Sequence, residues 1–157
     1  MNTFLPFADF TKSAQALDMK RLGKQRLEAW QIACAYLQPN APYTNHPAAR
    51  MWEDYLPALM LYGQAICKEW IKRGYEDSYL KVFNGILWSF RMQDMPEPMP
   101  PWLGDEELHA RYRAALIAKK PEFYIPLFET TPTPQDYIDE FKEAIENETP
   151  LPYKWPV

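Results

Sequence analysis

Four polar residues in the first long helical segment share one helix face at a spacing suited to chemistry. At about 100° of rotation per residue they fall within a narrow arc, with Lys24 at its edge. The four are Asp18, Arg21, Gln25 and Glu28. An acid, a base and an amide so placed can hold a phosphate, and a carboxylate among them can transfer protons. A solvated helix face with charge pairs three and four residues apart gives the same pattern, and the residues alone favour it.

Basic residues are concentrated in the same segment. The stretch 20–26, KRLGKQR, contains four cations, namely Lys20, Arg21, Lys24 and Arg26. This density is typical of a corner that contacts phosphates, although a simple surface charge cluster looks the same. Arg50, further along the chain, is a further candidate for holding a nucleic-acid backbone.

The two histidines each allow two interpretations. His46 precedes Pro47 at an expected helix start, and His109 lies on a later helix with Arg111 and Arg113 nearby. Each histidine could act as a general acid or base or bind a phosphate, and each could equally be a helix cap or a satisfied, partly buried side chain. Two histidines and two cysteines without ligand spacing predict no metal site, and no cofactor is expected.

No stretch alternates apolar and polar residues with the period of two that a strand requires, so helices must position these residues. The sequence predicts helices over 11–38, 47–72, 77–92, 103–120 and 134–147. In the first, apolar residues three and four apart predict the buried face: Met19, Leu27, Trp30, Cys34 and Leu37. Gly23 is a possible bend in it, and Pro57 should kink or split the second helix.

The predicted fold class is all-α: a single compact helical domain with an extended N-terminal arm and proline-rich loops. Residues 1–128 are expected to form the helical domain that carries the chemistry. Residues 129–157 are expected to add an acidic helix and an aromatic tail packed on the same domain.

Composition fits an intracellular globular protein. The chain has 157 residues, of which 47% are hydrophobic and 24% charged, so disorder is excluded. No apolar run is long enough for a membrane span and no secretion signal is recognised, so a cytoplasmic location is expected. Cys34 and Cys67 are expected to be buried thiols.

The net charge of −4 is unevenly distributed. Residues 1–50 carry six Lys or Arg against three Asp or Glu, a net +3, whereas 129–157 carry a net −5. The acidic excess therefore lies mainly in the last segment and does not argue against a nucleic-acid partner for the rest.

The order of several motifs resembles the pyrimidine dimer DNA glycosylase family, small all-α repair enzymes. The motifs are an N-terminal arm, KRLGKQRLE at 20–28, NHP at 45–47 opening a long helix that ends in KRG at 72–74, and KPEFY at 120–124. The patterns KRLGKQR, NHPA, PWLGDE followed by a histidine, and a terminal P-Y-x-W-P resemble a bacterial branch of it. The resemblance covers about 1–128 and the tail.

The resemblance implies an enzyme that cleaves the glycosidic bond of a damaged pyrimidine. In the family an N-terminal α-amine attacks the anomeric carbon, forms a Schiff base and permits strand cleavage by β-elimination. An α-amine has a pKa of about 7.7–8.0, so a usable fraction is unprotonated. The family's nucleophile is a threonine exposed by removal of the initiator methionine. Here Asn2 follows Met1, so the amine would be that of Met1, or of Thr3 after trimming.

The family's catalytic glutamate has no direct counterpart by position. A gap-free alignment of the first helix places Arg21 there, so Glu28, two turns on, or Asp18, one turn before, would supply the carboxylate. The 120–124 segment matches the family's aromatic DNA-binding loop, which makes Tyr124 a candidate for DNA contact.

DNA is therefore the expected partner of a monomeric enzyme that does not bind membranes. The expected DNA-binding residues are Lys20, Lys24, Arg26, Arg50, Arg111, Arg113, Lys119, Lys120 and Tyr124. The acidic helix beyond residue 134 would either pack on the domain or bind a protein partner. Two other functions remain open: a transferase or hydrolase that modifies pyrimidines in DNA, and a non-catalytic helical module that binds DNA or protein.

Overall fold

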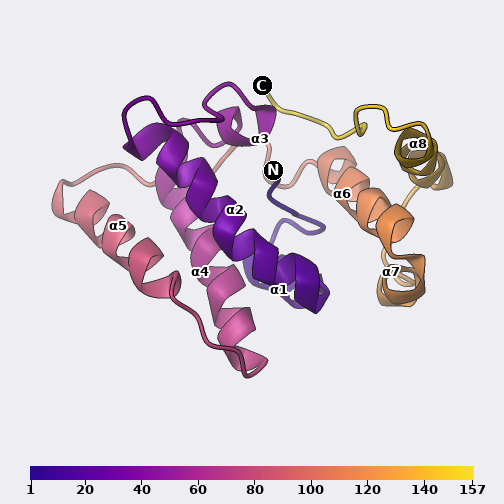
Figure 1. Ribbon diagram of the computed structural model, residues 1–157, viewed down its shortest axis with the longest axis horizontal. Helices are drawn as coiled ribbons and strands as arrows, with labels where there is room; N and C mark the ends of the chain where they lie inside the picture. The colour runs from indigo at the N-terminus through magenta and orange to yellow at the C-terminus, as the bar shows by residue number, and fades with distance from the viewer.

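Helices make up all the regular secondary structure, as Figure 1 shows for the computed structural model of residues 1–157. They are α1 Phe10–Ala16, α2 Met19–Leu37, α3 Pro47–Arg50, α4 Leu56–Lys72, α5 Leu80–Met92, α6 Glu106–Lys119, α7 Pro121–Leu127 and α8 Gln135–Glu146. The predicted all-α class is confirmed. None of these helices combines the length and apolarity that a membrane crossing requires.

The helices form two groups with the N-terminal arm between them (Figure 1). In the first, α4 packs against α1, α2 and α5. In the second, α6 packs against α7 and α8. A proline-rich loop from 93 to 105 joins the groups. The division at residue 128 stays a prediction, although Ile138 and Phe141 of α8 belong to the same hydrophobic core as the earlier helices.

The first predicted helix is two helices, so the prediction of one helix over 11–38 is wrong. Leu17 and Asp18 have extended backbones, with ψ values of 137° and 159°. The N–H of Asp18 donates to the hydroxyl of Tyr124 at 2.9 Å, and this hydroxyl donates to the Asp18 carboxylate. A buried contact more than a hundred residues away in the chain thus supports the break, which no local pattern encodes.

The predicted buried face of α2 is also wrong. Met19, Leu27 and Leu37 are 53%, 40% and 39% exposed. The buried residues are Leu22, Gln25, Glu28, Ala29, Ile32, Ala33 and Ala35. The polar stripe is turned inward because Gln25 and Glu28 hydrogen-bond to the backbone of the N-terminal arm, which replaces the water they lose.

The second predicted helix is split as Pro57 indicated. It forms α3 and α4, and Pro57 lies in the first turn of α4, where no helical N–H is required. Gly63 on α4 lies against the ring of Phe83 on α5. Gly23 lies inside α2, where the missing side chain admits the Trp70 ring of α4.

The C-terminal segment packs back onto the body, as predicted. Leu151, Tyr153 and Trp155 contact the core, and the Tyr153 ring centroid lies 5.0 Å from that of Phe141 and 5.5 Å from that of Tyr112. The helix α7 was not predicted. Pro121 starts it directly after α6 ends.

Two helical glycines give a matched test of the α4–α5 packing. A Cβ at position 63 would lie 2.8 Å from Phe83, so Gly63→Ala should destabilise the protein by about 1–3 kcal/mol. Gly85→Ala on α5 meets nothing within 4 Å and should stabilise it by up to about 1 kcal/mol. Urea unfolding followed by circular dichroism measures both. Equal effects of the two substitutions would contradict the close packing at Gly63.

Candidate active site

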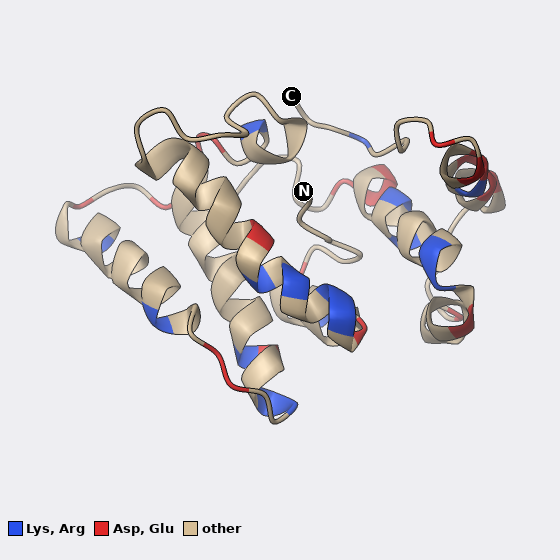
Figure 2. Cartoon of the chain, in the orientation of Figure 1, with Lys and Arg blue, Asp and Glu red and all other residues tan.

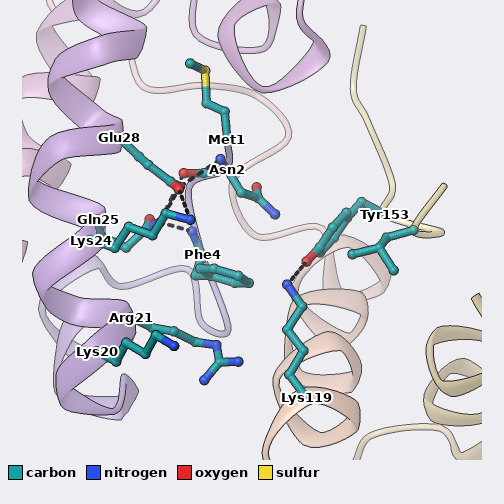
Figure 3. A pocket seen from close by; sticks show the side chains of 11 residues that line it. Met1, Asn2, Phe4, Lys20, Arg21, Lys24, Gln25, Glu28, Lys119 and Tyr153 are labelled. Atoms are coloured by element: carbon teal, nitrogen blue, oxygen red, sulfur yellow. Dashed lines mark hydrogen bonds and ion pairs between the residues drawn. The ribbon is translucent and has the colours of Figure 1, made fainter. Parts of the chain in front are cut away.

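One pocket of about 270 Å³ brings together residues from the N-terminal arm, α2, the end of α6 and the C-terminal tail (Figure 3). Its lining residues are Met1, Asn2, Phe4, Lys20, Arg21, Lys24, Gln25, Glu28, Lys119, Leu151 and Tyr153. Four of them are Lys or Arg, and Glu28 is the only carboxylate. The polar stripe of α2 predicted from the sequence, apart from Asp18, therefore lines a concave site.

Glu28 is the centre of the hydrogen bonds on the α2 wall. It is 6% exposed, and its Oε2 accepts from the Asn2 N–H and from Gln25 Nε2, each at 2.9 Å. Lys24 Nζ lies 3.4 Å from its Oε1. These donors hold a carboxylate in a fixed orientation at the pocket, as proton transfer requires.

Gln25 fixes the N-terminal arm beside Glu28. Its Nε2 also donates to the Asn2 carbonyl at 3.2 Å, and its Oε1 accepts from the Phe4 N–H at 3.0 Å. The same Oε1 lies 2.6 Å from the hydroxyl of Tyr62 on α4. The side-chain amide of Gln25 thus positions the arm and holds it at one place along α2.

The backbone nitrogen that donates to Glu28 is the amide of Asn2. Met1 lines the pocket, but its α-amine forms no ion pair with this carboxylate. Thr3 is fully buried, and its hydroxyl accepts from Trp52 Nε1 at 3.0 Å. Thr3 therefore lies in the core below the pocket, while Met1 lies at its edge.

Cations lie on both walls of the pocket. Lys20, Arg21 and Lys24 project from α2, and Lys119 projects from α6 on the opposite side (Figure 3). Figure 2 shows basic residues on the facing parts of these helices and acidic residues gathered on α8. This distribution agrees with the charge split seen in the sequence.

Asp18 and Tyr124 pair with each other outside the pocket. Asp18 is 3% exposed. Burial raises the pKa of its carboxyl, but the hydrogen bonds from Tyr124 and Arg21 and the charge of Arg21, 3.2 Å away, lower it by more, so the net shift is downward. Tyr124 is fully buried, so it cannot stack on a base in this structure, contrary to the prediction. Its neighbour Phe123, 40% exposed, is the accessible ring of that segment.

Three predicted DNA-binding arginines are occupied by the fold. Arg26 pairs with Asp77 at 2.6 Å and lies over the Trp70 ring. Arg113 is 1% exposed, and its partners are Glu106, Thr133 and the carbonyls of Pro6 and Pro132. Arg111 joins α6 to Glu140 of α8 and to the Pro152 carbonyl. These guanidiniums hold elements of the fold together, and their contact with DNA stays a prediction.

The remaining predicted cations are more accessible. Arg50 is exposed at the end of α3. Lys120, half-buried, lies 5.4 Å from the centroid of the Phe123 ring. Neither lines the pocket.

His109 is a buried structural residue in this fold. Its Nε2 accepts from the Gly104 N–H at 2.9 Å, and its Nδ1 lies 2.7 Å from the Leu5 carbonyl oxygen. This pairing requires the neutral ring with the proton on Nδ1. Burial, together with the charge of Arg113, lowers its pKa despite the bond to Leu5. With both nitrogens engaged, it has no free site for catalysis.

His46 lies near the chain terminus. Its Nδ1 accepts from the Ala48 N–H at 3.0 Å and so caps α3. Burial and the positive α-amine of Met1 lower the pKa of His46, whereas the negative charge of Glu28 raises it. His46 is therefore near enough to Met1 and Glu28 to sense their charges, although it does not itself line the pocket.

Apart from Lys119, the second wall of the pocket was not predicted from the sequence. Phe4, Leu151 and Tyr153 line it, and Tyr153 accepts a hydrogen bond from Lys119 at 3.3 Å. The terminal P-Y-x-W-P pattern pointed to the tail, but nothing in local spacing shows that the tail returns to the chain's own start.

An all-α fold with a basic pocket around one carboxylate is suited to chemistry on a phosphorylated substrate. A model of the pyrimidine dimer DNA glycosylase family matches residues 1–81. The chain belongs to this family. The match includes the arm and the α2 wall of the pocket but not α6 or the tail. No curated protein and no solved structure matches the chain.

The pairing of His109 predicts a loss of stability at mildly acidic pH. Because its folded-state pKa lies below the usual 6.5, its stabilising contribution is complete above that value and is lost as the pH falls through the folded pKa. Between about pH 7.5 and about pH 5.5, wild type should lose more unfolding free energy than His109→Asn. Urea titrations at each pH measure this difference. His46 shifts in the same direction and is retained in both proteins. Parallel pH profiles would contradict the assignment.

Proposed function

We propose that this protein is a DNA glycosylase that removes a damaged or modified pyrimidine, with Glu28 as the group that transfers protons. The observation that carries the proposal is the position of Glu28: it is the only carboxylate of a pocket that four cations surround, and it is oriented by two hydrogen bonds. The family membership supports glycosidic-bond cleavage as the reaction.

The cations of the pocket suit a DNA strand. Lys20 and Lys24 are exposed and able to reach phosphates, while Arg21 is partly exposed beside them. A nucleotide held at the pocket would be turned out of the duplex, since a stacked base keeps its glycosidic bond inaccessible. Phe4 and Leu151 supply apolar surface for that base.

When the base leaves, positive charge develops at C1′ of the sugar and negative charge on the leaving pyrimidine, and both must be stabilised. A carboxylate beside the sugar stabilises positive charge at C1′ and can relay a proton to the leaving pyrimidine. An amine that attacks C1′ would give a covalent imine and open the route to strand cleavage. The family resemblance indicates an N-terminal amine, which in this chain is that of Met1 at the pocket edge.

Glu28→Gln is the direct test. The amide preserves size and accepts the Asn2 N–H, but it cannot carry a proton, so cleavage of the glycosidic bond should fall by roughly 10²–10⁴-fold while DNA affinity persists. Because the cyclobutane ring keeps the detached thymine joined to its neighbour, the assay uses duplexes containing a single cis–syn thymine dimer, photoreverses the dimer after the reaction, and measures the thymine then set free by mass spectrometry. Asp18→Asn, the other carboxylate of the stripe, should lower stability and leave more of the activity, because Asp18 does not line the pocket.

The same assay distinguishes the other functions. Altered bases on intact glycosidic bonds would indicate a transferase or hydrolase that modifies pyrimidines. Unchanged DNA that remains bound to both wild type and Glu28→Gln would indicate a non-catalytic binding module. Either result would overturn the glycosylase proposal.

Salt dependence tests whether the α2 cations contact phosphates. Lys20→Ala should weaken binding to duplexes of any sequence and reduce the slope of log affinity against log salt by about 1. Lys81→Ala, an exposed lysine on α5, is the matched control and should leave the slope unchanged. Fluorescence anisotropy at several salt concentrations gives both slopes. Identical slopes for Lys20→Ala and wild type would contradict a contact between Lys20 and a DNA phosphate.

A further inference from the structure

The C-terminal tail brings to the pocket a phenol hydroxyl that the proposed mechanism has not used. Tyr153 lines the pocket, and its hydroxyl points from the tail toward the α2 wall (Figure 3). The oxygen accepts a hydrogen bond from Lys119 Nζ at 3.3 Å. Because a lysine ammonium can only donate, the single hydrogen of the hydroxyl must turn elsewhere, and no hydrogen bond within the protein takes it. Tyr153 therefore offers a free donor to a molecule in the pocket.

The surroundings of the two side chains favour this donation. Burial raises the pKa of Tyr153, so the hydroxyl keeps its proton at neutral pH. Burial lowers the pKa of Lys119, as do the positive charges of Arg21 and Lys24, and the negative charge of Glu28 only partly opposes them. A more acidic ammonium is a stronger donor, and hydrogen bonds in a chain polarise one another. Lys119 thus strengthens the hydroxyl as a donor.

Contacts on both sides of Tyr153 fix the tail in place. Lys154 Nζ pairs with the carboxylate of Asp105 at 2.7 Å. Arg111 Nη1 donates to the Pro152 carbonyl at 3.1 Å. A donor that is held in position before the substrate binds needs no reorientation when charge develops in the reaction.

The tail wall is the side of the pocket that suits a pyrimidine base. Phe4 and Leu151 supply apolar surface beside Tyr153, whereas Glu28 lies on the α2 wall, which would face the sugar. A base seated against the tail wall would bring one of its carbonyl oxygens to the hydroxyl. O2 is attached to the carbon next to N1, the atom bonded to C1′, so it lies nearer the sugar than O4 does.

The charge on a departing pyrimidine collects at this oxygen. When the bond between N1 and C1′ breaks, the bonding pair stays on N1 and is shared with O2. In an intact pyrimidine the C5=C6 double bond also passes charge to O4, but the cyclobutane ring of a dimer removes that double bond. A donor at O2 therefore meets the charge where it develops, which is how a fixed hydrogen bond lowers a reaction barrier.

We propose that the Tyr153 hydroxyl, backed by Lys119, donates to O2 of the departing pyrimidine and stabilises it as the leaving group. This assignment rests on the proposed glycosylase function and adds the group that the base meets as it leaves. It leaves the nucleophile and the role of Glu28 as proposed above. The proton that the nucleophile releases on bonding to C1′ ends on the base, and Tyr153 keeps its own.

Tyr153→Phe keeps the ring and removes the donor. Cleavage of the glycosidic bond in the dimer duplex, measured in a single turnover with the protein in excess, should fall roughly 10²-fold, while DNA affinity stays near that of wild type. Tyr75→Phe removes a hydroxyl that does not line the pocket, so this matched control should cleave at the wild-type rate. Circular dichroism checks folding. A wild-type rate in folded Tyr153→Phe would overturn the assignment, as would a loss confined to affinity.

Lys119→Met tests whether the lysine acts through Tyr153. It should slow the same single-turnover cleavage when Tyr153 is present and add no further loss when it is combined with Tyr153→Phe. Losses that add in the double variant would overturn the proposed backing of the hydroxyl by Lys119.

A crystal structure of Glu28→Gln bound to the dimer duplex gives a readout that does not depend on how Tyr153→Phe folds. The expected result is Tyr153 Oη within hydrogen-bond distance of O2 of the pyrimidine in the pocket. A pyrimidine seated away from Tyr153, or turned so that O4 meets the hydroxyl, would overturn the assignment. Failure of the wild-type protein to cleave the dimer duplex would instead overturn the proposed function, whatever Tyr153 contacts in the complex.

Discussion

An extended segment buried between helices must have its backbone polar groups satisfied by side chains, and this constraint governs the protein. The backbone of the N-terminal arm takes part in no helix or sheet hydrogen bonds of its own. Gln25 and Glu28 of α2 bind its first residues, and Tyr62 of α4 donates to the Phe4 carbonyl. On the other side, His109 and Arg113 of α6 bind the carbonyls of Leu5 and Pro6. Because an unpaired buried group costs about 1–3 kcal/mol, the arm connects the two helix groups rather than merely filling space between them.

The same constraint creates the site. Glu28 could not be buried on α2 without donors, and the arm provides one in the Asn2 N–H. Holding the arm in register therefore also holds the carboxylate that the proposed chemistry uses. It also brings Met1 to the pocket and sets the Phe4 ring between Gln25 and Lys119. Stability and function are thus supported by one set of hydrogen bonds, and a substitution such as Gln25→Ala would affect both.

The sequence predicted the all-α class, the split at Pro57 and the polar stripe of α2, because each follows from local periodicity or backbone geometry. It failed where distant contacts prevail. Periodicity ranks residues by polarity, so it placed Leu27 inside and Glu28 outside; the arm reverses both. The break at Asp18 depends on Tyr124, and the second pocket wall depends on the tail, neither of which a helical wheel can show. Tyr124 was predicted as a DNA contact from its segment alone, and the structure buries it.

The two walls of the pocket come from parts of the chain that differ in their relation to the family. The wall within residues 1–81, which the family model matches, carries Glu28 and three of the four cations of the pocket. The opposite wall carries Lys119, Leu151 and Tyr153, which lie outside the match. Under the proposed function, part of the apolar surface that would face the base comes from the tail, so the choice of base would depend on that wall more than on α2.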